Sequence, residues 1–283
     1  GLADGIDLVI STARLNRLVD HAVRDLTVTV EAGMPFAQLQ QTLQQFHQQL
    51  CLDPSYADHA TLGGIVATAD TGSCRQRYGG VRDMVIGITV VRSDGQVARA
   101  GGQVVKNVAG YDLMKLFTGA YGTLGIISQL TVRLYPIPPV SRTLVLAGNG
   151  DAIQATAAAI MASALTPIRF DLLSASLVDA LGFGRNGEGN LGILIQFQAI
   201  DVSVAQQVSQ TQKLAADHHL QISAVSDAPE QHLWKRLREQ MQDTPIDGTL
   251  TCKMGVRASQ GGATLQHFAE KLPPESLGII HAS

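Results

Sequence analysis

The sequence has 283 residues, of which 45% are apolar and only 16% are charged. At about 150 residues per domain this length predicts two domains, and a chain this long buries a sizeable core without disulfide bonds. The composition excludes intrinsic disorder, and the net charge of −3 gives no indication of a nucleic-acid-binding surface. No apolar run reaches the length of a bilayer-spanning helix, and no signal peptide is evident.

The ends and the cysteines give two further expectations. Both ends look cut, because the first residue is Gly1, not Met, and Ser283 follows an apolar run. The three cysteines, Cys51, Cys74 and Cys252, form no CxxC pair and are odd in number. Reduced thiols in a cytosolic protein are therefore expected, without a disulfide framework or an iron–sulfur site.

The first half of the chain reads as short strands separated by two helices. Apolar residues alternate with Thr and Glu over residues 26–31, which is typical of a half-buried strand. Pro35 then opens a helix predicted to run to about Gln49, since apolar residues recur there every three or four positions. Asp94 and Gly95 predict the turn of a β-hairpin. The other predicted elements are strands over residues 85–91, 96–100 and 126–134 and a helix over residues 111–117.

The prolines Pro136, Pro138 and Pro139 predict the border between two domains, residues 1–138 and 139–283, because proline stops a strand and stiffens a linker. Beyond the border, strands and helices alternate around a glycine-rich turn over residues 186–192, which predicts an α+β domain on one antiparallel sheet. The predicted strands are residues 143–146, 168–173, 191–200, 221–225, 249–256 and 277–281. The predicted helices are residues 153–165, 202–219, 229–240 and 263–272.

The densest glycine region lies between residues 60 and 125. Adjacent glycines in the loop over residues 60–64 let backbone N–H groups approach a ligand, and a helix beginning at Gly64 would form an anion site suited to a phosphate. Arg75, Arg77 and Arg82 add charge nearby, although a structural turn explains the loop equally well. The P-loop spacing is absent, and the glycines over residues 119–125 precede a strand, whereas a Rossmann fingerprint follows one.

Residues 105–113 read VKNVAGYDL, and residues 119–127 read GAYGTLGII. Together with residues 53–54, 60–64 and 78–83, these stretches resemble FAD-linked oxidases of the vanillyl-alcohol-oxidase type, the PCMH-type family. Within that family, residues 11–15, 75–83 and 101–135 resemble the FAD-binding E subunits of bacterial glycolate oxidases. The resemblance is strong over residues 7–137 and looser beyond.

The resemblance implies an α+β fold: a PCMH-type FAD-binding domain of two subdomains over residues 1–138, the first incomplete, and a ferredoxin-like cap domain over residues 139–283. It implies that residues 60–64 hold the FAD pyrophosphate and that Gly72, Tyr78, Gly79 and Asp83 line the path to the isoalloxazine ring. Residues 125–127 are implied to lie along the cofactor. Binding is expected to be non-covalent, with Cys74 a buried thiol. The residues implied to bind FAD are Pro54, Ala60, Thr61, Leu62, Gly63, Gly64, Thr68, Gly72, Tyr78, Gly79, Arg82, Asp83, Gly125, Ile126 and Ile127.

Family members carry a further glycine-rich FAD loop, upstream of every motif found here. The resemblance therefore implies that this chain by itself binds FAD weakly or not at all. A stoichiometric flavin absorbance of the purified chain would contradict this expectation.

Oxidation of a 2-hydroxy acid needs a base for the hydroxyl proton, a cation for the carboxylate and a flavin that accepts the hydride. Residues 279–281 resemble the start of the HxGDGN-like stretch of catalytic relatives, with His281 at its first histidine and Ser283 in place of its glycine. His281 is thus a candidate base, and Arg257, on a predicted cap strand, a candidate carboxylate anchor. The alternatives are a plain strand-end histidine and a solvated arginine. Lys106 and Asn107 are candidates for ordering their own loop.

The function implied by the resemblance is that of the FAD-binding subunit of a glycolate oxidase complex. It would oxidise glycolate, with D-lactate as a second candidate, to the 2-oxo acid. The implied partners are a D-type flavoprotein subunit and an iron–sulfur subunit that takes the electrons. The expected location is the cytoplasm, peripheral on the inner membrane through the complex. The alternative is a non-catalytic subunit that carries flavin or supports a catalytic D subunit, which is favoured because the HxGDGN continuation after His281 is missing.

Overall fold

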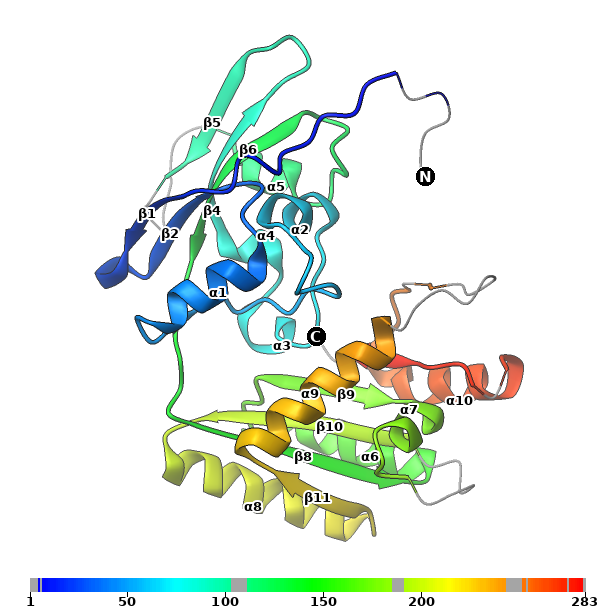
Figure 1. Cartoon of the computed structure of the whole chain (residues 1–283). Helices are drawn as coiled ribbons and strands as arrows, with labels where there is room; N and C mark the ends of the chain where they lie inside the picture. The colour runs from blue at the N-terminus through cyan, green and yellow to red at the C-terminus, as the bar shows by residue number, and fades with distance from the viewer. Residues whose placement is uncertain are drawn as a thin grey trace. The chain divides into compact units, whose positions relative to one another are not determined.

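The computed structural model describes residues 5, 7–102, 111–184, 191–242, 251–252, 254–273 and 275–281 (Figure 1). Two compact units form: unit 1 is Gly1–Thr71 with Gly79–Ile137, and unit 2 is Gly72–Tyr78 with Pro138–Ser283. The chain therefore enters unit 2 briefly at residues 72–78 and for good after Ile137. Lys106, Asn107 and most of the glycine-rich turn expected over residues 186–192 lie outside the described residues.

Unit 1 is built on a five-stranded antiparallel sheet in the order β1-β2-β6-β4-β5. Its strands are β1 (Leu18–Ala22), β2 (Thr27–Glu31), β4 (Val85–Val91), β5 (Val97–Gly101) and β6 (Ile126–Arg133). Its other described elements are η1 (Val23–Asp25), α1 (Phe36–Gln44), β3 (Gln48–Gln49), α2 (Leu62–Thr68), α4 (Val81–Met84), α5 (Leu113–Phe117) and β7 (Tyr135–Pro136). The strands, the hairpin and the helix expected at residues 111–117 are confirmed to within two residues.

The helix predicted from Pro35 to about Gln49 is wrong in its last turn. Helix α1 ends at Gln44, and Gln48 and Gln49 instead form β3 against β7. His47 has a φ of 54°, and this left-handed backbone prevents the helix from continuing. The apolar face was predicted correctly where the helix exists, since Leu39 and Leu43 are fully buried.

Two glycines of the β4–β5 hairpin differ in what a side chain would meet. Both have a positive φ, but a Cβ on Gly95 would meet open space, whereas one on Gly101 would lie 2.0 Å from the backbone oxygen of Ile86. We expect Gly95→Ala to cost about 1–2 kcal/mol, the ordinary price of the left-handed region. Gly101→Ala must also displace the backbone of Ile86. It should therefore lower the melting temperature, measured by calorimetry, more than Gly95→Ala does. Equal effects of the two substitutions would contradict this packing.

The carboxylate of Glu31 at the end of β2 is tied to Arg17. It accepts hydrogen bonds from the Arg17 backbone N–H at 2.9 Å and from its guanidinium at 2.7 and 3.1 Å. Hydrogen bonding from the Arg17 side chain is the main reason that the pKa of Glu31 lies below its ordinary value. A carboxylate with a lowered pKa stabilises the fold above its ordinary pKa, about 4.3 for Glu, and loses that contribution as the pH falls.

Glu31→Gln is therefore expected to destabilise unit 1 at neutral pH and to matter progressively less as the solution is acidified below about pH 4. Urea unfolding of both proteins, followed by far-ultraviolet circular dichroism across this range, measures the difference. A gap between the two proteins that stays constant or widens in acid would be inconsistent with the ion pair.

Unit 2 contains a second five-stranded antiparallel sheet, in the order β11-β8-β10-β9-β12 (Figure 1). Its strands are β8 (Val140–Gly148), β9 (Arg169–Leu173), β10 (Leu191–Ala199), β11 (Gln221–Val225) and β12 (Ile279–His281). Its other described elements are α3 (Arg75–Tyr78), α6 (Gly150–Met161), α7 (Ala175–Ala180), α8 (Asp201–Asp217), α9 (Asp227–Gln242), η2 (Ala258–Gln260) and α10 (Gly261–Lys271). The α+β prediction for this half is confirmed, while α7 was not predicted.

The strand predicted over residues 249–256 is wrong in the part that the structure describes. Residues 251–252 and 254–256 have no regular secondary structure and are exposed. In the described sheet the position beside β9 is taken by β12, and residues 251–252 and 254–256 pair with no described strand.

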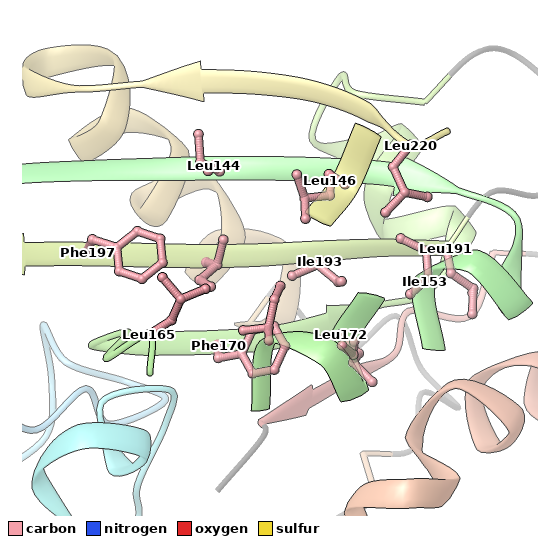
Figure 2. Packing of buried hydrophobic residues seen from close by; sticks show 14 of the residues in the cluster. Leu144, Leu146, Ile153, Leu165, Phe170, Leu172, Leu191, Ile193, Phe197 and Leu220 are labelled. Carbon is pink, nitrogen blue, oxygen red and sulfur yellow. The ribbon is translucent and has the colours of Figure 1, made fainter. Parts of the chain in front are cut away.

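Both faces of the unit 2 sheet are covered. On one face, Leu144, Leu146 and Phe197 lie in a buried cluster with residues of α6, α8 and α10 (Figure 2). On the other, Val145 and Ala147 pack with residues of α7 and α9. Alternate residues of β8 thus enter different cores, which explains why its sequence is a continuous apolar run. Among the described residues, no helix is long and apolar enough to cross a membrane.

Candidate functional site

The loop over residues 60–64 leads into helix α2 of unit 1. The Thr61 hydroxyl accepts a hydrogen bond from the Gly64 N–H at 3.2 Å and so caps the helix. The N–H groups of Leu62 and Gly63 donate to backbone oxygens of the segment that follows β2, at 3.0 and 2.7 Å. Three backbone donors of the loop therefore have protein acceptors, and the expected role of these donors in holding a pyrophosphate stays a prediction.

A second stretch of the resemblance packs directly on α2. The N–H of Gly119 donates to the Val66 oxygen at 2.9 Å, and that of Tyr121 donates to the Ala67 oxygen at 2.8 Å. Farther on, Gly125 has a φ of 147° and approaches β4 so closely that a Cβ would lie 2.7 Å from the Val91 oxygen. Motifs almost sixty residues apart in the sequence thus form one region of unit 1.

The residues implied to bind FAD differ in their solvent exposure. All except Gly72 and Tyr78 belong to unit 1. Gly64, Thr68, Arg82 and Asp83 are exposed. Pro54, Leu62 and Ile127 are buried, and the others are half-buried.

Gly79 and Asp83, two of the residues implied to bind FAD, shape the turn at the start of helix α4. The Asp83 carboxylate accepts a hydrogen bond from the Gly80 N–H at 2.8 Å, and Gly79, with a φ of 82°, leaves room for that carboxylate. The Asp83 carboxylate therefore stabilises the turn, whereas the guanidinium of its neighbour Arg82 lies at the surface. The Arg82 guanidinium and the neighbouring glycine backbone are groups that fit a phosphate-bearing cofactor, whereas the Thr68 hydroxyl already donates to the Gly64 oxygen at 2.9 Å.

Unit 2 brings together three polar side chains from distant parts of the sequence, which we call the Asp171 cluster: Ser73, Asp171 and His281. Asp171 is fully buried on β9, and its Oδ1 lies 2.7 Å from Nδ1 of His281, its cross-strand partner on β12. Its Oδ2 accepts a hydrogen bond from the Ser73 hydroxyl at 2.5 Å. The Ser73 oxygen also lies 3.3 Å from His281 Nδ1.

Arg169 lies two residues before Asp171 on the same face of β9. Its Nη1 donates to Oε1 of Gln196 at 2.9 Å and its Nε to the Cys74 sulfur at 3.3 Å. Its guanidinium also stacks over the Trp234 ring, 4.6 Å from the ring centre. Cys74 is buried, as expected of a structural thiol.

Arg257 was expected on a strand of this unit, and that placement is wrong. It is exposed, lies in no strand, and its backbone oxygen accepts a hydrogen bond from the N–H of Gln260, the last residue of η2. The described sheet ends with β12 beside β9 and does not include residues 254–257. His281, by contrast, does lie in a strand, with its side chain 35% exposed.

Two members of the Asp171 cluster were missed from the sequence. Asp171 had a signal, since it is a charged residue inside the apolar run predicted as a strand over residues 168–173. Burying a charge is costly unless it is paired, which marks such a residue for attention. Ser73 had no signal in the sequence, because only the tertiary fold places it beside a strand about a hundred residues away.

Comparison with known proteins agrees with this architecture. Residues 2–101 match the family model described as "FAD binding domain". Alkyldihydroxyacetonephosphate synthase superposes with a TM-score of 0.68 at 17% identity, over 81% of this chain and 47% of that one. These findings define an α+β protein with a PCMH-type FAD-binding fold.

The sequence relatives of the chain include proteins named for the oxidation of 2-hydroxy acids. The chain is 30% identical over 237 residues to the mitochondrial cytochrome-dependent D-lactate dehydrogenase of Arabidopsis thaliana, covering 81% of this chain and 41% of the relative. It is 38% identical over 128 residues to the glycolate oxidase subunit GlcE of Escherichia coli K12, covering 45% and 37%. The chain is thus similar, over part of its length, to FAD-linked proteins named for D-lactate and glycolate oxidation, and it spans about two fifths of the length of these relatives.

Proposed function

We propose that this chain is the FAD-binding part of a flavoprotein that oxidises small 2-hydroxy acids to 2-oxo acids. The observation that carries the proposal is the agreement of two relatives named for glycolate and for D-lactate. Both acids carry a hydroxyl on the carbon next to the carboxylate. Glycolate is the first candidate substrate, because the greater of the two identities is to the glycolate oxidase subunit.

The reaction removes the proton of the substrate hydroxyl. It also removes a hydride from the carbon that bears this hydroxyl, and FAD, when bound, accepts the hydride. The protein must supply a base for the proton and a cation for the carboxylate. His281 is the proposed base, because its imidazole is half-exposed and held by Asp171. Arg257 is the proposed cation, on its exposed segment. The same Asp171 cluster favours a catalytic subunit over a passive flavin carrier.

In unit 1, the fifteen residues named by the resemblance are proposed to hold non-covalent FAD. Arg82 supplies a charge at the surface, and the exposed Thr68 hydroxyl, which donates to the Gly64 oxygen at 2.9 Å, can still accept a hydrogen bond. The proposed partners are a D-type flavoprotein subunit and an iron–sulfur subunit that receives the electrons. The proposed location is the cytoplasmic face of the inner membrane, through that complex.

Turnover of the protein supplied with excess FAD and an artificial electron-accepting dye tests the proposal. We expect the 2-oxo acid to form from glycolate and D-lactate and not from L-lactate, since the lactate-oxidising relative is named for the D form. Product from none of the three acids would contradict the proposed function.

A matched pair of histidine variants tests the proposed base. We expect His281→Gln to lower kcat by about 100-fold or more, which is the usual contribution of a general base. His267→Gln, at an exposed position of α10, should leave kcat unchanged. Equal activities of the two variants would remove His281 as the base.

A further inference from the structure

Asp171 is a fully buried carboxylate whose side-chain hydrogen-bond partners among the described residues are Ser73 and His281. Burying a carboxylate is costly unless donors satisfy it. The neighbouring cation, Arg169, is directed to Gln196, Cys74 and Trp234, and no ion pair between Arg169 and Asp171 occurs in the described chain. The hydroxyl of Ser73 and the ring of His281 therefore provide the side-chain hydrogen bonds that satisfy the buried carboxylate.

The geometry determines which nitrogen of His281 carries a proton. An ionised carboxylate only accepts hydrogen bonds, so the 2.7 Å contact with Oδ1 requires a proton on Nδ1. The Ser73 hydroxyl donates to Oδ2, which leaves a lone pair of its oxygen facing the same Nδ1 at 3.3 Å. Both neighbours of Nδ1 are thus acceptors. A neutral His281 then has its lone pair on Nε2.

We propose that Asp171 is a positioning residue: with Ser73 it fixes His281 as the Nδ1–H tautomer, so that Nε2 is the atom that accepts a proton. Resting on the proposed function, this proton is that of the substrate hydroxyl. The substrate O–H bond would break and an N–H bond would form at Nε2, and bound FAD would supply the acceptor for the hydride of the carbon that bears this hydroxyl. The Asp171 carboxylate stabilises the resulting imidazolium at 2.7 Å.

The tautomer can be measured without cofactor or substrate. The full chain, labelled with nitrogen-15 at histidine, gives long-range proton–nitrogen correlations that distinguish a protonated ring nitrogen from an unprotonated one. The spectrum is recorded at a pH well above the ordinary histidine pKa of about 6.5. His281→Gln identifies the signals of His281.

We expect Nδ1 of His281 to be protonated and Nε2 unprotonated. In Asp171→Asn the side-chain amide can donate to Nδ1, so the Nε2–H form should appear. Asp217→Asn, at the exposed end of α8, should change nothing. Ser73→Ala keeps the carboxylate and should keep the Nδ1–H form, which retains the test if Asp171→Asn does not fold. A wild-type His281 with its proton on Nε2, or an Asp171→Asn spectrum identical to the wild type, would overturn the proposal.

Activity then separates this proposal from the proposed function. If Asp171→Asn shifts the tautomer and lowers kcat for D-lactate with KM little changed, both stand. If the wild-type tautomer is as expected but no 2-hydroxy acid is oxidised, positioning by Asp171 stands and the proposed function fails. If Asp171→Asn keeps full activity while its tautomer shifts, the proton-transfer role of Nε2 is overturned.

Discussion

Replacing Phe197 by alanine is expected to lower the free energy of unfolding of unit 2 by about 3–5 kcal/mol. Phe197 lies on the central strand β10, and its side chain is fully buried in the cluster that α6, α8 and α10 cover (Figure 2). Truncation removes the ring from this core and leaves a cavity that the neighbouring strands can only partly fill. The effect should therefore be among the largest of any single substitution in the chain.

The single tryptophan of the sequence, Trp234, belongs to unit 2 and reports on it. Urea unfolding followed by tryptophan fluorescence measures the loss. Val202→Ala, only a few residues away but at a side chain that is 75% exposed, is the control and should change stability by no more than about 0.5 kcal/mol. Similar effects of the two substitutions would mean that Phe197 is not in a packed core.

Replacing Glu230 by alanine is expected to cost about 3 kcal/mol, because hydrogen bonds to a buried charged group are strong and their donors are left unsatisfied. The buried Glu230 carboxylate accepts hydrogen bonds from Ser141 at 2.9 Å, Thr143 at 2.5 Å and Gln196 at 2.9 Å. Thr143 in turn accepts from Trp234 at 3.0 Å. Helix α9 is thus attached to the sheet by a polar network as well as by apolar packing.

Glu239→Ala on the same helix is the matched control. Glu239 is exposed and forms only a surface pair with Lys235, so its loss should cost about 0.5 kcal/mol or less. The tryptophan fluorescence of the Glu230 variant should also shift in the folded state, since the network reaches the indole N–H. A Glu230 variant as stable as the Glu239 variant would show that the network adds nothing.

The parts of the fold that the sequence predicts are those controlled by local physics. The run over residues 143–147 is buried on both faces, and its apolar character predicts a strand without knowledge of its neighbours. The Asp-Gly turn likewise predicts the β4–β5 hairpin. Strand β1 was missed because it is an edge strand with mostly solvent-accessible side chains, and hence shows no strong apolar alternation.

Only the part of the candidate site that lies in contiguous motifs could be predicted from the sequence. The resemblance identified the cofactor loops and His281, because these are contiguous motifs. It did not identify Asp171 or Ser73, whose importance depends on β12 pairing with β9 and on residues 72–78 returning to the same sheet. The error at Arg257 has the same origin. Which strand occupies an edge depends on long-range pairing, and a single sequence carries little information about it.

The claim that this chain has its own 2-hydroxy-acid site is tested most directly by anaerobic mixing of the protein, saturated with FAD and free of other subunits, with glycolate or D-lactate. The absorbance of the oxidised flavin follows the transfer of the hydride. We predict bleaching with both acids and none with L-lactate. A spectrum that stays unchanged with glycolate and D-lactate would contradict the claim and would leave a flavin-carrying subunit that depends on a catalytic partner.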